Sequence, residues 1–159
     1  MTKVKFFIIL FWIFCISTLN TNTASAQVYY SVGAGLAFSF NDDYQDLGTS
    51  IRGEFHIAPS TTIVPNYVAF QYLKIFSADL HMKLHPESPL YYPLVGLNVA
   101  FIENRDSGEV ETKLGANLGL GGSLALFEML SIFTEYRYIW GDKAYKQGTG
   151  NVGLLFHIN

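Results

Sequence analysis

Strict alternation between apolar and small or polar residues over 113–140 constrains this chain more than any other feature. Mostly glycine, serine and asparagine separate the apolar residues of the first half, and Glu135 and Arg137 separate those of the second half. The halves meet in a short connection around Glu128. Because successive side chains of a strand point to opposite faces, the stretch predicts a long hairpin with one apolar and one small or charged face. The apolar face carries Leu114, Ala116, Leu118, Leu120, Leu124, Leu126, Ile132, Tyr136, Tyr138 and Trp140, with Gly122 and Thr134 among them.

The same period of two recurs along the chain and predicts eight strands in all. Segment 61–70 is the weakest of them, because Pro65 removes a ladder donor and neither face is clearly polar. There we expect a bulged strand or a strand whose end belongs to a loop, so the course over 61–74 stays open. Besides the two arms of the hairpin, strands are expected at 28–40, 47–58, 61–70, 76–84, 91–102 and 150–158.

The scarcity of charge indicates that this chain meets lipid. Half of the residues are hydrophobic and 16% are aromatic, whereas only 14% are charged; an average soluble domain has about 25%. The polar strand faces are rich in glycine, serine and asparagine, which suits a crowded interior better than the charged exterior of a soluble sandwich. The formal net charge of −3 argues against a nucleic-acid partner.

Residues 1–26 are typical of a secretory signal peptide, which leaves 27–159 as a single outer-membrane β-barrel domain. Lys3 and Lys5 precede an apolar run, and Ala24-Ser25-Ala26 offers small residues at the positions that a signal peptidase reads. The apolar run is shorter than the roughly 20 residues that a membrane-spanning helix needs, which disfavours an anchor.

Eight strands of this length predict an all-β fold, an eight-stranded antiparallel up-and-down transmembrane β-barrel after a cleaved signal peptide. The barrel must close, because an open edge in lipid would leave backbone groups without hydrogen-bond partners. With both termini in the periplasm, we expect inner turns near Pro59, Pro86 and Glu128, and outer connections at 41–46, near Gln71, at 103–111 and at 141–148.

Charged residues on the inward faces are the candidate functional residues. Cations and anions are equal in number, so they can compensate one another in a lumen wide enough only for side chains. We interpret them as a structural network of salt bridges, with gating of a small conductance as the alternative. The six are Arg52, Glu54, Asp79, Lys83, Glu135 and Arg137.

Motifs for catalysis, cofactors and metals are weak. The glycine runs at 33–35 and 119–121 do not open a helix, as a dinucleotide-binding loop does. His81 and His85 lack the further ligands that zinc needs. Outer-membrane deacylases place a His two residues before a Ser, and no His of this chain has that neighbour. We therefore expect no catalytic residue, no cofactor and no metal.

The glycine-rich strand, the brief turn and the Glu135-Tyr136-Arg137-Tyr138 strand resemble one family of outer-membrane β-barrels, that of the transmembrane domain of outer-membrane protein A. The likeness extends more loosely over 28–159 and includes 92–96 and 151–153. It implies an eight-stranded barrel with an inward Glu and Arg on the seventh strand. The chain departs from the family in ending on Phe156-His157-Ile158-Asn159 rather than on an aromatic residue.

These observations favour a small barrel of the bacterial outer membrane with a structural or surface-interaction role and no catalysis. A narrow porin-like channel is the alternative, and a lipid A-modifying acyl hydrolase is a further one. The expected partners are outer-membrane lipid, lipopolysaccharide and the barrel-assembly machinery, and we expect a monomer. Any surface ligand is unknown. The outer loops hold the acids that could meet a surface partner, namely Asp42, Asp43, Asp46, Glu103, Asp106, Glu109 and Glu111.

Signal-peptide cleavage gives the first prediction. The protein isolated from cell envelopes should begin at Gln27, because cleavage follows Ala26. Intact mass spectrometry of the purified protein measures this directly. A mass that includes residues 1–26 would contradict it.

Overall fold

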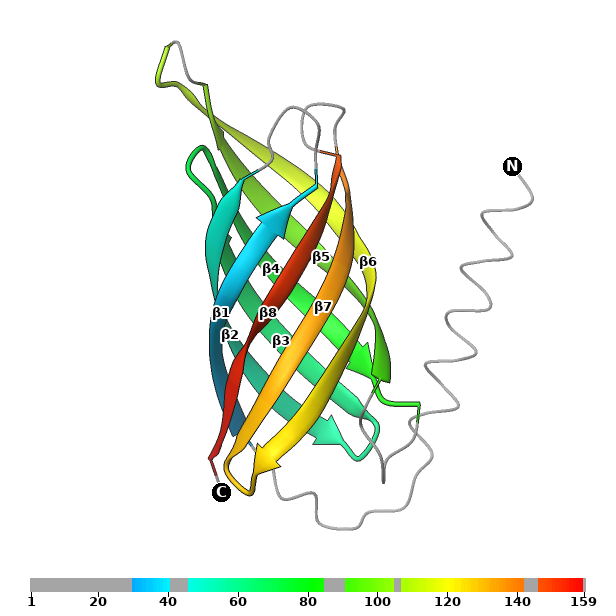
Figure 1. Ribbon diagram of the computed structural model, residues 1–159. Helices are drawn as coiled ribbons and strands as arrows, with labels where there is room; N and C mark the ends of the chain where they lie inside the picture. The colour runs from blue at the N-terminus through cyan, green and yellow to red at the C-terminus, as the bar shows by residue number, and fades with distance from the viewer. Residues whose placement is uncertain (1–29, 41–45, 85–90, 105–106, 142–145, 159) are drawn as a thin grey trace, which may run out of the picture.

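In the computed structural model, which describes residues 30–40, 46–84, 91–104, 107–141 and 146–158, an antiparallel sheet closes on itself as a barrel (Figure 1). Within these ranges no helix is long and apolar enough to span a bilayer. The eight strands are β1 (Tyr30–Ser39), β2 (Leu47–Ala58), β3 (Thr61–Ala69), β4 (Leu73–Met82), β5 (Tyr91–Glu103), β6 (Val110–Phe127), β7 (Leu130–Trp140) and β8 (Gln147–Ile158).

Pairing between β1 and β8 closes the sheet. The two strands run antiparallel from Tyr30↔Ile158 to Ser39↔Thr149, and every other strand pairs with its neighbours in sequence. Each strand therefore has two hydrogen-bonded neighbours, which leaves the barrel wall without an edge strand. This confirms the predicted eight-stranded up-and-down barrel.

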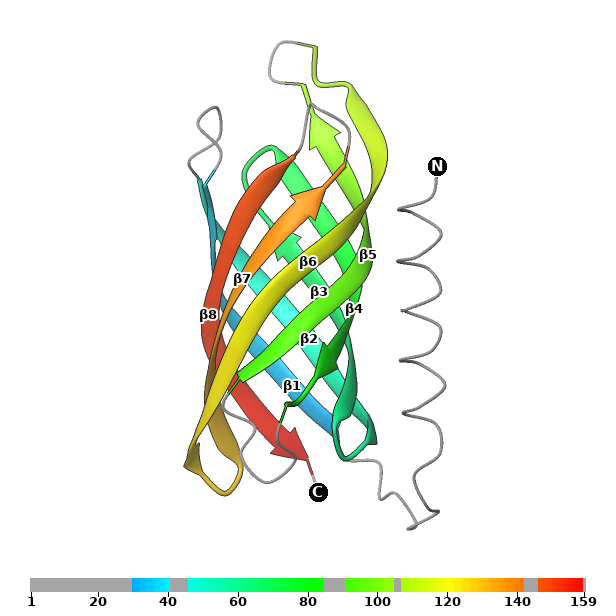
Figure 2. The ribbon, with the colours of Figure 1, turned by 90° about the vertical axis from the view of Figure 1, so that its right-hand side faces the viewer.

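The strands are tilted, and the two ends of the barrel differ (Figures 1 and 2). We call the end with the C-terminus the lower end; the β2–β3 and β6–β7 turns lie there. The other, upper end carries the β5–β6 hairpin, which rises above the neighbouring strands.

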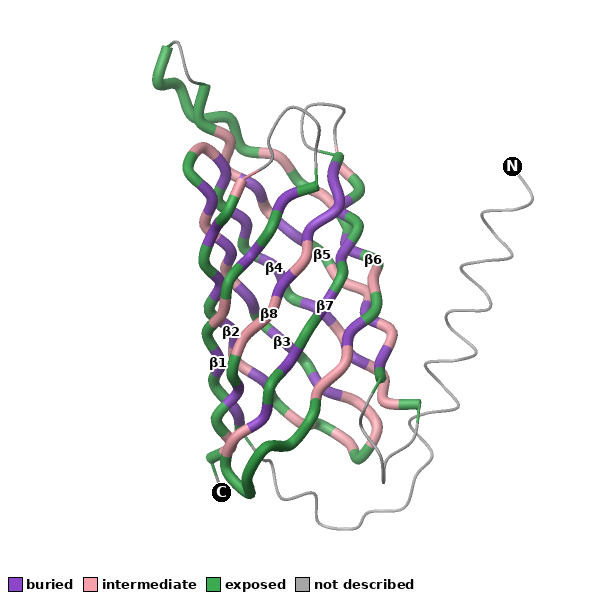
Figure 3. Tube along the Cα trace, viewed as in Figure 1, coloured by how far each residue is buried: buried purple, intermediate pink, exposed green. Residues whose placement is uncertain are grey.

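Burial follows the predicted alternation but is inverted relative to a soluble protein. On β6, Leu114 and Leu118 are 77% and 66% exposed, whereas Glu135 and Arg137 on β7 are 4% and 3% exposed. Exposed and buried residues alternate along the strands (Figure 3). The apolar faces therefore form the outside of the barrel, and the polar faces line the lumen.

The course over 61–74, which the sequence left open, is a regular strand followed by a tight turn. β3 pairs with β4 through Pro65↔Ala78, and the Phe70 amide donates to the Leu73 carbonyl at 2.8 Å. Pairing with β2 is interrupted opposite Pro65, between Arg52↔Asn66 and Phe55↔Ile63. Pro65 lacks a backbone N–H, so one position of the ladder loses its donor. The strand nevertheless continues, and the ring of Pro65 lies on the exposed outer face.

Three strands begin earlier than the sequence pattern indicated. β4 begins at Leu73 rather than at Phe76, β6 at Val110 and β8 at Gln147. The expected loops over 103–111 and 141–148 are correspondingly shorter. Backbone pairing continues at these ends although the side chains there no longer alternate in polarity.

Several predicted features lie wholly or partly outside the described residues. They are the signal peptide 1–26, the strand residues 28–29, most of the loop 41–46, the turn 85–89, and parts of the connections 103–111 and 141–148.

Two glycines face each other across the seam between β1 and β8. Gly35 pairs with Gly153. A Cβ at position 153 would lie 2.7 Å from the Gly35 Cα and 2.8 Å from the Phe133 ring. Both distances are shorter than a van der Waals contact, so the seam at this level admits only glycine.

We predict that Gly153→Ala destabilises the folded barrel by about 1–3 kcal/mol through overpacking. Gly53→Ala is the matched control, because its Cβ would meet Phe55 and Pro65 at 3.4 and 3.6 Å, ordinary contact distances. Urea unfolding in detergent micelles measures both variants. Equal midpoints for the two would contradict a glycine-dependent seam.

Candidate functional site in the barrel interior

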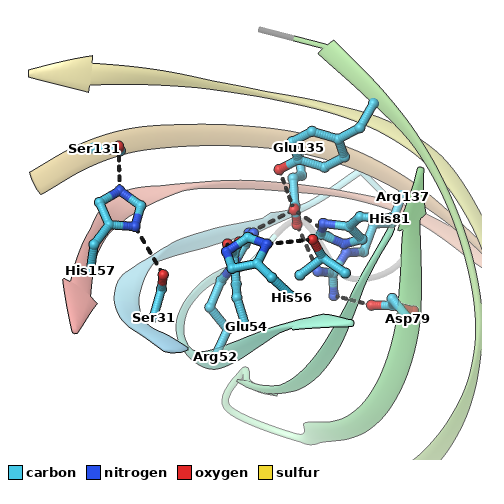
Figure 4. Close-up of polar contacts among 12 residues, drawn as sticks. Ser31, Arg52, Glu54, His56, Asp79, His81, Ser131, Glu135, Arg137 and His157 are labelled. Atoms are coloured by element: carbon cyan, nitrogen blue, oxygen red, sulfur yellow. Dashed lines mark hydrogen bonds and ion pairs between the residues drawn. The ribbon is translucent and has the colours of Figure 1, made fainter. Parts of the chain in front are cut away.

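Glu135 on β7 is the centre of the polar interior. Its Oε1 accepts hydrogen bonds from Arg52 Nη1 at 2.6 Å and from the Tyr92 hydroxyl at 2.8 Å. Its Oε2 accepts from Arg137 Nη2 at 2.6 Å. His81 Nε2 lies 3.6 Å from Oε1. One carboxylate therefore joins side chains from β2, β4, β5 and its own strand, across the lumen (Figure 4).

Two further carboxylates extend the network to either side. Arg52 also forms an ion pair with Glu54, and Arg137 Nη1 lies 3.1 Å from Asp79 Oδ2. Negative and positive charges therefore alternate along this series of ion pairs, which runs from Glu54 through Arg52, Glu135 and Arg137 to Asp79. All five are nearly inaccessible to solvent. Buried charges are tolerated when they are paired and hydrogen-bonded in this way.

Neutral side chains donate further hydrogen bonds to the Asp79 carboxylate. Ser77 Oγ donates to Oδ2 at 3.0 Å, and Asn117 Nδ2 donates to Oδ1 at 2.7 Å. Asn98 Nδ2 in turn donates to Asn117 Oδ1, the side-chain amide oxygen, at 2.5 Å. The second carboxylate is thereby tied to β5 and β6 as well as to Arg137.

Strand geometry explains why these residues meet. Arg52 and Glu54, like Glu135 and Arg137, are two residues apart, so each pair shares the lumen face of its strand. Gly121 lies opposite Glu135 in the β6–β7 register. A Cβ at Gly121 would lie 2.8 Å from the Glu135 side chain and would collide with the Tyr92 ring. The glycine thus provides the space in which Tyr92 reaches Glu135.

Lys83 is the one predicted network residue outside these ion pairs. It follows the last residue of β4 and is half-buried near the lower end. Burial lowers the pKa of its ammonium group, and the nearby Glu54 carboxylate partly opposes this shift. The structure therefore brings together five of the six candidates and leaves Lys83 below them.

Three aromatic side chains belong to the network although the sequence reading did not include them. The His81 ring stacks on Tyr92 with centroids 4.5 Å apart and planes inclined by 16°. The guanidinium of Arg52 lies 4.0 Å from the centroid of Phe133, a cation–π contact. The sequence pattern places His81 and Tyr92 on the predicted inward faces, which was the available signal. It carried no prediction for Phe133.

Above the charged network, hydrophobic side chains occupy much of the lumen, beside the buried and hydrogen-bonded Ser39 and Gln147. The hydrophobic side chains come from β1, β3, β4, β5 and β7, so they extend across the interior. A cavity of about 10 Å³ beside Phe70 and Leu73 is too small for more than a single water. We call this set the apolar layer: Ala37, Val68, Phe70, Leu73, Ile75, Ala100 and Ile139.

A histidine joins three strands at the lower end. His157 on β8 makes hydrogen bonds to Ser31 Oγ on β1 through Nδ1, at 2.9 Å, and to Ser131 Oγ on β7 through Nε2, at 2.7 Å. The spacing of His and Ser along one strand carries no information on contacts between strands. Since both ring nitrogens are taken by serines, neither is available to the orienting carboxylate of a catalytic triad.

No metal-binding group of three or more His, Cys, Asp or Glu side chains occurs in the described part of the chain.

A closed eight-stranded barrel with an apolar exterior and a paired-charge interior defines the fold of the small transmembrane β-barrels. No protein-family model matches the sequence, and no curated protein matches it.

Solved structures of this fold do match. The N-terminal barrel domain of Pseudomonas aeruginosa OprF is 18% identical, with a TM-score of 0.65 over 83% of this chain and 100% of that domain. Neisserial surface protein A is 16% identical, with a TM-score of 0.55 over 82% of this chain and 96% of that one. The Yersinia pestis outer membrane protein Ail is 15% identical, with a TM-score of 0.54 over 83% of this chain and 100% of that one.

A transmembrane barrel designed de novo matches to a similar degree, at 15% identity and a TM-score of 0.53. At such identities the likeness establishes the eight-stranded outer-membrane barrel fold and leaves the role of each protein open.

We predict that Glu135→Gln lowers the free energy of unfolding by about 3–5 kcal/mol. The substitution removes the negative charge with which both Arg52 and Arg137 form ion pairs, so two buried cations lose a partner. Glu111→Gln is the control: its carboxylate is 65% exposed and lies 3.3 Å from Lys113, and such surface pairs contribute about 0–1 kcal/mol. Urea titration in micelles, read by gel mobility, compares the two. If both unfold at the same midpoint, Glu135 is not the centre of the network.

Proposed function

We propose that this protein is a small barrel of the bacterial outer membrane with a structural or surface-interaction role, a closed lumen and no catalytic activity. It would be inserted by the barrel-assembly machinery and act as a monomer surrounded by outer-membrane lipid. The observation that carries the proposal is the inverted burial. Side chains such as Leu97 and Leu114 are 72% and 77% exposed on the outer surface, where only lipid offers them a suitable environment.

Two barriers in series support a closed lumen. An ion entering from the upper end would have to shed most of its water in the apolar layer, where Ser39 and Gln147 are hydrogen-bonded to each other. Below the apolar layer it would meet Arg52, Glu135 and Arg137, which already occupy the lumen and neutralise one another. A barrel of eight strands is wide enough for side chains alone. These features argue against the porin-like alternative.

The interior also argues against hydrolysis. Ser31 and Ser131 are 2% and 5% exposed, so a lipid acyl chain outside the barrel cannot reach the serines beside His157. An oxyanion hole needs free backbone N–H donors, whereas Ser31 and Ser131 are each in register with a residue on both neighbouring strands. The contacts of His157 are suited to holding β1, β7 and β8 together.

The β5–β6 hairpin supports a role at the cell surface. Its two strands stay paired up to Glu103↔Val110, whereas β6 pairs with β7 only from Ala116 onward. The hairpin thus projects beyond the barrel wall and carries exposed acids at Glu103, Glu109 and Glu111. Two of the structural neighbours are named as a surface protein and as an attachment invasion locus protein.

The proposal predicts a heat-modifiable outer-membrane protein that does not conduct. Fractionation should recover it in the outer membrane, and unboiled samples should migrate differently from boiled ones. In planar bilayers it should give no conductance steps under conditions in which a porin of about 16 strands conducts. Recovery as a soluble periplasmic protein would overturn the proposal, and regular conductance steps would favour the channel.

A further inference from the structure

A lysine lies between two interfacial aromatic rings on the outer surface. Lys146 Nζ is 5.9 Å from the ring centroid of Tyr138 and 6.0 Å from that of Trp140. Lys146 immediately precedes β8, and the two aromatic residues end β7, all at the upper end. Trp140 is 70% exposed and Lys146 is also exposed. The rings position the ammonium group by cation–π attraction and leave its N–H donors for another partner.

A second lysine lies on the outer face at the upper end of another strand, next to an aromatic residue in register. Lys74 on β4 is exposed and pairs in register with Phe101 on β5. One step lower on the same outward face, Phe76 contacts Tyr67 and Phe101, with ring centroids 4.4 and 6.0 Å apart. Two lysines from distant parts of the sequence therefore stand at the upper rim of outward-facing aromatic clusters.

Two outward-facing lysines and two hairpin acids stand at different heights at this end of the barrel, and the hairpin also carries the Glu111–Lys113 ion pair. The outward-facing lysines lie level with the aromatic rings at the strand ends, whereas Glu103 and Glu109 lie higher, on the projecting hairpin. In a barrel spanning the membrane, aromatic girdles mark the headgroup level. The lysines are therefore at the depth of the lipid phosphates, and the acids stand above them.

We propose that Lys146, together with Tyr138 and Trp140, binds a phosphate group of a phosphorylated glycolipid in the outer leaflet. Lys74, on the opposite side of the barrel, would meet a different lipid molecule. This inference rests on the proposed outer-membrane location and names the lipid that the barrel meets there. An ammonium group supplies hydrogen-bond donors and a positive charge to a phosphate oxygen, and the indole N–H supplies a further donor.

Lipid titration tests this binding site. The mature protein is placed in phosphatidylcholine nanodiscs with increasing mole fractions of bisphosphorylated lipid A, and binding is followed by the emission of Trp140. The only other tryptophan is Trp12, within the predicted signal peptide, so Trp140 reports alone in residues 27–159. Dephosphorylated lipid A and free inorganic phosphate are titrated in parallel to separate lipid phosphate from other sources.

Lys146→Gln should require about fivefold more lipid A for half-maximal change, because one cation near a membrane surface contributes about that factor. Lys146→Arg should bind like the wild type. Lys113→Gln is the matched control, since Lys113 lies on the lumen-facing side of β6 and pairs with Glu111; it should leave the midpoint unchanged.

Three outcomes would overturn the inference: an unchanged midpoint in Lys146→Gln, an equal loss in Lys113→Gln, or equal binding of dephosphorylated lipid A. A matching response to inorganic phosphate would also overturn it, because the site would then be one for a free anion. Heat-dependent gel mobility shows that each variant is a folded barrel. The proposed location is judged separately by fractionation, so either conclusion can fail without the other.

Discussion

Closure of the hydrogen-bonded ladder between β1 and β8 is the constraint on which the rest of this structure depends. In hydrocarbon an unpaired backbone N–H or C=O costs several kcal/mol, and no water is present to satisfy it. Closing the sheet requires an even number of antiparallel strands when the first and last are to pair. Closure also places the first residue of β1 and the last residue of β8 at the same end of the barrel. It requires glycine where Gly35 and Gly153 meet.

A closed barrel of this size then decides what the interior can hold. Side chains must fill the lumen, yet the outer face uses the apolar residues for contact with lipid, so polar groups line much of the inside. Sharing Glu135 between Arg52 and Arg137 offsets much of the cost of burying these charges. The apolar layer occupies much of the upper part, next to the hydrogen-bonded pair Ser39 and Gln147. The two layers make the interior a support for the wall rather than a passage.

The chain matches a designed barrel and natural ones at identities of 14 to 18% among them. The barrels share the fold although most of their residues differ. The role proposed for this chain therefore depends on its own local features. They are the contacts of His157 with two serines, the projecting β5–β6 hairpin, and the lysines beside aromatic rings at the upper rim.

The sequence alone determined the number of strands, their antiparallel order and the face on which each residue lies, because a period of two is a property of the local backbone. It also indicated the inward positions of Arg52, Glu54, Asp79, Glu135 and Arg137. Only the tertiary structure decided which of them touch, since contacts between β2 and β7 depend on register and closure rather than on spacing along one strand. For the same reason it alone revealed that Lys83 stands apart, that His157 meets serines from β1 and β7, and that 61–74 is a regular strand and tight turn.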